Sequence, residues 1–105
     1  MMTPEQRQLA DALVAELLHQ LRNPPADPAT RARRVALVRQ ALGAGLAGKA
    51  VPLLAVMGKA APADAEIALL HGVALRLGQR LVEAVGVFAA AVAAGARDPA
   101  LLQGL

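Results

Sequence analysis

Residues 63–95 read ADAEIALLHGVALRLGQRLVEAVGVFAAAVAAG, and this stretch decides the fold. Two apolar runs lie on either side of a short polar break, Gly-Gln-Arg, at residues 78–80. Apolar residues recur at steps of three and four in both runs, which fits the period of a helix and not the strict alternation of a strand. They are Leu69, Val73 and Leu77 in the first run, and Leu81, Val85, Phe88 and Val92 in the second. The stretch therefore predicts a helical hairpin that turns at Gly78.

The hairpin recurs when the sequence is compared with itself at an offset of 34 residues. This offset pairs Val51 with Val85, and it places Leu53, Leu54 and Val56 on Val87, Phe88 and Ala90. A helix-turn-helix period of this length is the signature of the tetratricopeptide repeat. The stretch from about residue 31 to residue 99 resembles that family.

The residues behind the resemblance occupy set points of each repeat. They are Leu37, Val38, Ala41, Gly45, Ala50, Leu54, Met57 and Pro62 in the first copy, and His71, Gly72, Leu75, Ala84, Phe88 and Ala91 in the second. The second copy departs from the pattern, because Gly78 comes one residue early and Pro99 three residues late. The chain also lacks tryptophan and tyrosine, which belong to the family signature. An unrelated all-helical bundle is therefore the alternative.

The resemblance implies an all-α fold of antiparallel helical hairpins, a tetratricopeptide-like α-solenoid with five to six helices. A length of 105 residues suits a single domain. We expect an N-terminal helix over 3–23, a first repeat over 28–62, a second repeat over 63–97 and the start of a short last helix over 98–105. Small residues at Gly72 and Ala84 should face each other or a neighbouring helix, without room for a larger side chain.

Local signals mark several helix ends. Thr3-Pro4-Glu5-Gln6 fits a capping box with proline at the first helical position. Residues 23–25, Asn-Pro-Pro, should end the first helix, because proline disfavours helical geometry in the residue before it. Asp27-Pro28 and Asp98-Pro99 each read as a cap followed by the first residue of a helix.

The composition of the chain indicates its cellular compartment and suggests that part of its apolar surface is covered by a partner. The chain has no cysteine, which rules out disulfides and thiolate metal sites and fits a reducing cytosol. We expect no signal peptide and no membrane span, since the longest uncharged apolar run, 84–96, is shorter than the ~20 residues that a bilayer requires. The chain is 56% hydrophobic, yet two repeats are fewer than the ~3 that usually stabilise a stack. We therefore expect a cytoplasmic protein with a surface that a partner covers.

Catalytic chemistry is not evident in the sequence. The chain contains no serine and none of the common hydrolase, metalloprotease or phosphate-binding motifs. His19 and His71 lie on or beside apolar stripes and read as packed or half-exposed residues, so we expect no metal and no cofactor. Phe88 is the sole aromatic residue, which leaves no stacking surface for nucleic acid. We expect a protein that is not an enzyme and binds no nucleic acid.

One charge cluster lies at the start of the second expected helix. Its members are Arg31, Arg33, Arg34 and Arg39, in a chain of net charge +3. The first interpretation is a solvated helix start, and the second is attraction to an acidic partner.

The family resemblance also implies a binding surface. Tetratricopeptide repeats bind peptides or helices in a concave groove lined by the first helix of each pair. The residues that match by position are Val35, Arg39 and Leu42 in the first copy, and Leu69, Val73, Arg76 and Leu77 in the second. An apolar groove with two arginines would suit an amphipathic helix that presents leucine-like anchors and a few acids. The alternative is that these residues form core beneath the first helix.

One subfamily is similar in size, helix count and groove character. The small tetratricopeptide-like chaperones of bacterial type III secretion hold an export substrate, such as the needle subunit, by its amphipathic C-terminal helix. They are cytoplasmic and work with a small helical co-chaperone, and without it we expect self-association, for example as a homodimer. The alternative is a general tetratricopeptide adaptor or scaffold in another protein complex.

Overall fold

The computed structural model describes residues 1–22 and 27–104. Within these ranges it has six helices and no strand, which confirms the all-α prediction of five to six helices. The predicted stop at residues 23–25 lies outside the described residues. The helices are α1 (Pro4–Arg22), α2 (Pro28–Gly43), α3 (Ala47–Ala60), α4 (Ala65–Leu77), α5 (Leu81–Ala93) and α6 (Pro99–Gln103).

Three helices begin at the caps that the sequence predicts. Thr3 and Gln6 form a reciprocal capping box, in which each side chain accepts a hydrogen bond from the other residue's backbone N–H, at 2.9 and 3.1 Å. The side chain of Asp27 accepts a hydrogen bond from the Thr30 N–H at 2.7 Å, and Asp98 caps α6 in the same way. These local bonds satisfy backbone donors that a helix start would otherwise leave unpaired.

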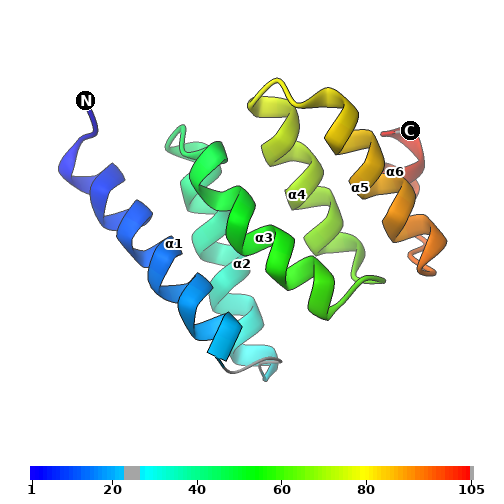
Figure 1. Cartoon of the computed structure of the whole chain (residues 1–105), viewed down its shortest axis with the longest axis horizontal. Helices are drawn as coiled ribbons and strands as arrows, with labels where there is room; N and C mark the ends of the chain where they lie inside the picture. Colours follow the sequence, from blue (N-terminus) through cyan, green and yellow to red (C-terminus); the bar gives the residue numbers. More distant parts are fainter. Residues whose placement is uncertain (23–26, 105) are drawn as a thin grey trace.

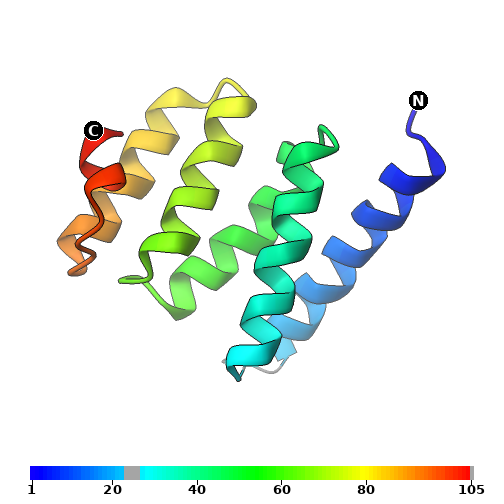
Figure 2. The same cartoon turned by 180° about the vertical axis from the view of Figure 1, so that it is seen from behind.

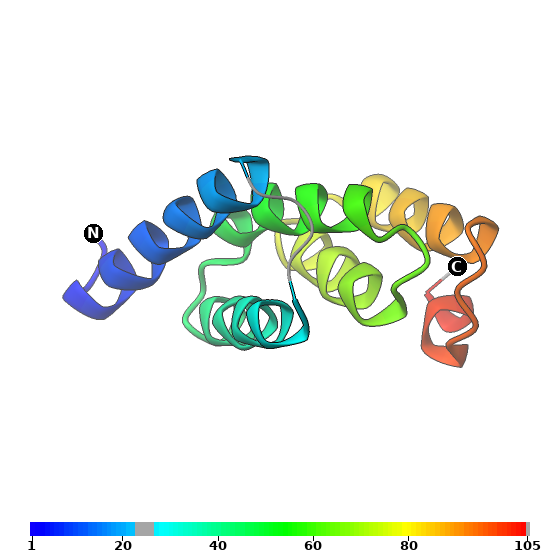
Figure 3. The same ribbon diagram turned by 90° about the horizontal axis from the view of Figure 1, so that it is seen from below.

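The helices pack in two layers (Figures 1 and 3). Helices α1, α3 and α5 lie along one side, whereas α2 and α6 lie on the other side with α4 between them (Figure 3). Helix α4 contacts α2, α3, α5 and α6, and is therefore the central element.

The turns of the α2–α3 and α4–α5 hairpins have similar backbone geometry. Gly45 and Gln79 are 34 residues apart (79 − 45), and both have left-handed backbone geometry, with φ of 80° and 65°. Each turn is closed by the same hydrogen bond of 2.8 Å, from Leu46 N–H to the Ala41 carbonyl and from Arg80 N–H to the Leu75 carbonyl. The expected turn residue, Gly78, instead has an ordinary φ of −88°. In the second hairpin the strained position is therefore held by glutamine.

The core has two parts that meet at α4. The larger cluster lies among α1, α2, α3 and α4, and the smaller one is built around Phe88, which is 1% exposed. A Cβ atom at Gly72 would lie 2.1 Å from Cζ of Phe88, so the absence of a side chain at Gly72 makes room for the aromatic ring. Gly72 thus faces the neighbouring helix α5 without room for a larger side chain, as expected, and Ala84 is buried.

A buried arginine joins α1 to α2. Arg34 is 1% exposed, and its Nε donates a hydrogen bond to Oε2 of Glu16 at 2.8 Å. Its other nitrogens bond to the Gln20 side-chain oxygen and, at 2.6 Å, to Nδ1 of His19. Burial raises the pKa of Glu16, but the hydrogen bonds from Arg34 and Arg33 outweigh it and hold that pKa below its ordinary value. Glu16 is thereby kept ionised beside the buried guanidinium.

Replacing Gln79 with glycine should stabilise the protein by about 1 kcal/mol, because a left-handed backbone costs a residue with a side chain about 1–2 kcal/mol and glycine avoids most of this cost. Urea denaturation would show the gain as a higher midpoint at an unchanged slope. The matched control is Gly45→Gln, which puts the same side chain into the equivalent turn and should destabilise by a similar amount. A neutral or destabilising Gln79→Gly would contradict the strain assigned to this turn.

Gly72→Ala should destabilise the protein by about 1–3 kcal/mol, because the new methyl group overlaps the ring of Phe88. Gly86→Ala is the control: it also lies within a helix, but its added Cβ meets nothing within 4 Å. That control should gain up to about 1 kcal/mol from helix propensity. Thermal melting of both variants distinguishes them, and equal shifts would show that Gly72 is not a packing position.

Arg34→Met should destabilise the protein by about 1–3 kcal/mol, because Glu16 loses its buried partner, keeping only Arg33, and the side-chain oxygen of Gln20 loses its donor. The folded-state pKa of Glu16 is lowered, so its pair adds stability that is lost as pH falls below the ordinary value of 4.5. Urea unfolding between about pH 3 and pH 7 should therefore show that the free energy of unfolding falls less on acidification in Arg34→Met than in the native chain. Arg33→Met is the control, since Arg33 pairs with the same carboxylate but is 60% exposed and should cost at most about 1 kcal/mol.

Candidate partner-binding face

An exposed apolar row runs along α4 on the side between α2 and α6. Leu69, Val73 and Leu77 recur at steps of four and therefore share one side of the helix. Val73 is 39% exposed and Leu77 58% exposed, whereas Leu69 is half-buried. Helices α2 and α6 both contact α4 but not each other, and Figure 2 views the domain from this side. We call this surface the α2–α4 face, formed by Leu69, Val73, Arg76 and Leu77 of α4 with Arg39 of α2.

The two remaining residues of the predicted groove lie deeper. Val35 is 7% exposed and belongs to the larger core cluster, so it lies beneath the α2–α4 face and not on it. Leu42 is half-buried and packs against the same cluster. The alternative that these positions serve the core therefore describes Val35, whereas Val73 and Leu77 are open to solvent.

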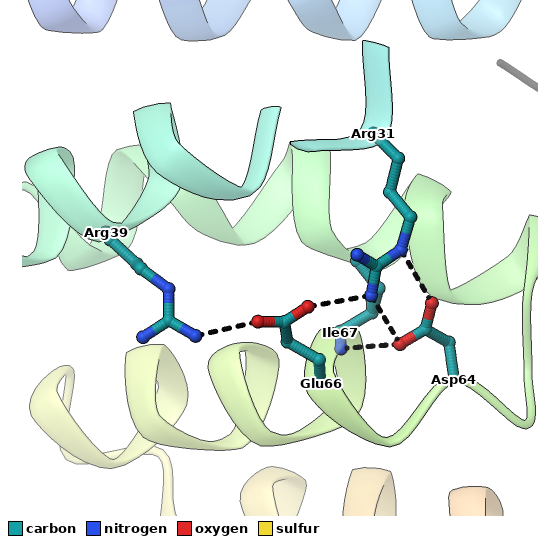
Figure 4. Close-up of polar contacts among 5 residues, drawn as sticks. All are labelled: Arg31, Arg39, Asp64, Glu66 and Ile67. Carbon is teal, nitrogen blue, oxygen red and sulfur yellow. Dashed lines mark hydrogen bonds and ion pairs between the residues drawn. The ribbon is translucent and has the colours of Figure 1, made fainter. Parts of the chain in front are cut away.

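An ion-pair network joins α2 to the start of α4 (Figure 4). Arg31 Nε donates to Asp64 Oδ2, and its Nη2 donates to Glu66 Oε1, both at 2.9 Å. The other oxygen of Glu66 accepts a hydrogen bond from Arg39 Nη2 at 2.8 Å. Asp64 also caps α4 by accepting from the Ile67 N–H at 3.2 Å. These bonds hold the two helices side by side along the edge of the face.

The network favours the charged forms of Arg31, Asp64 and Glu66. Hydrogen bonds with Asp64 and then Glu66 raise the pKa of the Arg31 guanidinium. Burial raises the pKa of Asp64, but the hydrogen bond from Arg31 and the Ile67 N–H outweigh it and leave that pKa lowered. Hydrogen bonds from Arg39 and Arg31 lower the pKa of Glu66. The carboxylates at the start of α4 also interact favourably with the positive end of the helix dipole.

Arg39 can exchange its partner at small cost. Its side chain is 58% exposed and that of Glu66 is 41% exposed, and such solvent-exposed pairs contribute about 0–1 kcal/mol. A carboxylate from another protein could therefore take the place of Glu66 beside Arg39. The network positions the arginine without burying it.

Arg76 lies on the opposite side of the apolar row, toward α6. Its guanidinium is 5.1 Å from the centre of the Phe88 ring, within the range of a cation–π contact. Its Nη2 also donates a hydrogen bond of 3.3 Å to the Gly104 carbonyl. The row of Leu69, Val73 and Leu77 thus has one exposed arginine on its α2 side and another on its α6 side.

Each arginine of the α2 cluster has a carboxylate partner on a neighbouring helix, and only Arg34 is buried. Arg33 and Arg34 pair with Glu16 of α1, and Arg31 and Arg39 pair with the acids of α4 described above. Sequence reasoning missed this arrangement. The carboxylates were visible as residues, but which helices would become neighbours of α2 depends on the packing of the chain.

Other chemistry is sparse in the described part of the chain. A cavity of about 350 Å³ lies among α3, α4 and α5; small side chains line much of it, and the half-buried imidazole of His71 borders it. Burial, and then the charge of Arg80, lower the pKa of His71. Over residues 1–22 and 27–104, no group of three His, Cys, Asp or Glu side chains could hold a metal ion. No helix in these ranges is both long enough and apolar enough to cross a membrane.

Comparison with known proteins identifies no relative of this chain. No family model, no curated protein and no solved structure matches the chain. The candidate face therefore depends on its own geometry.

Proposed function

We propose that this chain is a non-enzymatic protein-binding module that holds an amphipathic helix of a partner against the α2–α4 face. The observation that carries the proposal is the exposure of Val73 and Leu77, 39% and 58%, on the helix that lies at the centre of the domain. Exposed apolar surface with a polar border is a common mark of an interaction site.

The chemistry of the face specifies the partner helix. Helix α4 has 13 residues and is about 20 Å long, so a partner helix of similar length can lie along it. Apolar side chains at steps of three and four on that helix would contact Leu69, Val73 and Leu77. Acidic side chains on its two flanks would meet Arg39 and Arg76, and they would also steer the encounter at low salt.

The family resemblance extends this proposal to a biological role. We propose a cytoplasmic, tetratricopeptide-like chaperone of bacterial type III secretion that holds an export substrate such as the needle subunit, together with a small helical co-chaperone. Two observations support a tetratricopeptide-like arrangement: the 34-residue spacing between the left-handed turn residues Gly45 and Gln79, and the packing of the helices in two layers. The alternative role is that of a general adaptor that uses the same face within another protein complex.

The face is tested with Val73→Asp and a matched control, Leu21→Asp on α1, where the native leucine is 59% exposed. Partners captured from a lysate of the source cells would be identified by mass spectrometry, and binding of a purified partner measured by calorimetry. We expect Val73→Asp to weaken binding at least ~10-fold, about 1.4 kcal/mol, by placing a charge in the apolar contact. Leu21→Asp should leave the affinity unchanged, and both variants should keep the helical circular dichroism of the native chain.

A charge test and an activity test complete this experiment. Arg76→Gln should weaken binding at low salt and reduce the dependence of affinity on ionic strength. If Val73→Asp and the control bind the partner equally well, the α2–α4 face is not the binding site. A chaperone, unlike an adaptor, should also prevent polymerisation of its partner, which light scattering measures directly.

A further inference from the structure

The outer side of α5 is apolar but is not covered by the rest of the chain. Only Ala84, Phe88 and Ala91 of this 13-residue helix are buried. The exposed residues include Leu81 at 59%, Val82 at 87% and Val85 at 44%. With the exposed Ala89, Val82 and Val85 recur at steps of three and four and share one side of the helix. We call this surface the α5 face, formed by Leu81, Val82, Val85 and Ala89.

The α5 face contains no charged side chain that could pair with a charged partner. Glu83 is the single charged residue of α5, and it forms hydrogen bonds with Arg80 just before the helix, at 2.9 and 2.5 Å. Both charges at this end are thus paired within the chain. The surface that complements the α5 face is therefore an apolar, uncharged one, unlike the partner expected for the α2–α4 face with its two exposed arginines.

We propose that the α5 face binds the α5 face of a second copy of this chain, with the two helices antiparallel about a twofold axis. In such an interface the same patch serves both subunits, so an uncharged apolar surface is its own complement and no like charges meet. Pairing would also increase the number of repeats that stack on one another. Two repeats per chain are fewer than a repeat stack usually requires, and joining two chains through α5 brings four repeats into one assembly.

The size of the face predicts a weak dimer. Specific interfaces bury about 800 Å² per partner, and weak ones less than about 600 Å², which would be about a tenth of the 6163 Å² surface of this chain. A single helix of 13 residues, about 20 Å long, supplies an interface at the low end of that range. We expect a monomer–dimer equilibrium that depends on concentration in the micromolar range.

The first test is sedimentation equilibrium of the full chain from about 1 µM to about 500 µM. The wild type should shift from monomer toward dimer, and Val82→Glu should raise the dimer dissociation constant at least tenfold by burying a charge in the contact. Because Val82 is 87% exposed, the variant should keep the native circular dichroism. Leu18→Glu on α1, where the leucine is 46% exposed, is the matched control and should dimerise like the wild type.

The second test locates the contact by crosslinking. The chain contains no cysteine, so a single introduced thiol is a clean reporter. Val85→Cys should give covalent dimers with a short bis-maleimide reagent, whereas Leu18→Cys should remain monomeric. A wild type that stays monomeric at the highest concentration overturns the proposal. So does a dimer that Leu18→Glu disrupts and Val82→Glu does not.

These results are independent of the function proposed for the α2–α4 face. Val73→Asp alters that face and should leave the dimer intact, whereas Val82→Glu alters α5 and should leave the affinity for the partner helix intact. If Val73→Asp keeps its partner affinity, the proposal for the α2–α4 face is wrong; if Val82→Glu keeps the dimer, the proposal for the α5 face is wrong.

Discussion

The pairing of the α2 arginines with carboxylates on the adjacent helices is the interaction on which the arrangement of the domain depends. Arg34 shows why, since a guanidinium that is 1% exposed must find partners for its donors inside the protein. It finds them on α1, in Glu16, Gln20 and His19. Sliding α1 by one turn would leave a charge buried without a partner, which costs several kcal/mol. The buried network therefore adds to the apolar contacts of Leu13 in positioning α1.

Helix α2 also helps to position α4, through arginines other than Arg34. Arg31 and Arg39 bond to acids in the first turn of α4, where Asp64 also serves as the cap. One carboxylate thus starts the helix and holds it against its neighbour. The apolar row of α4 can remain open because these polar bonds and the contacts with α3 and α5 already hold the helix in place. A surface that contributes little to the stability of its own fold is available for a partner.

Signals that act within a few residues could be read from the sequence, and those that depend on packing could not. The capping residues Thr3, Asp27 and Asp98 predict helix starts because their bonds reach only two or three residues. Periodicity marks Val35 and Val73 alike as apolar positions, but it does not say that Val35 enters the larger core cluster whereas Val73 remains exposed. The sequence predicts the turn of the second hairpin at Gly78, yet the residue with left-handed geometry is the next one, Gln79. The partners of Arg34 lie 14 to 18 residues away on another helix, beyond the reach of any local pattern.

The division of the core into two clusters also bears on how the domain opens. The smaller cluster contains few large side chains, with Phe88 at its centre, and together with the contacts of Arg76 it holds α5 and α6 to α4. Such a unit can detach while the larger cluster remains folded, because the free energy of a local opening follows the apolar surface that is lost. Backbone amides of α5 and α6 should therefore exchange with deuterium well before those of α3, and limited proteolysis should remove the C-terminal hairpin first. The domain would then behave as a stable base of four helices that carries a detachable end.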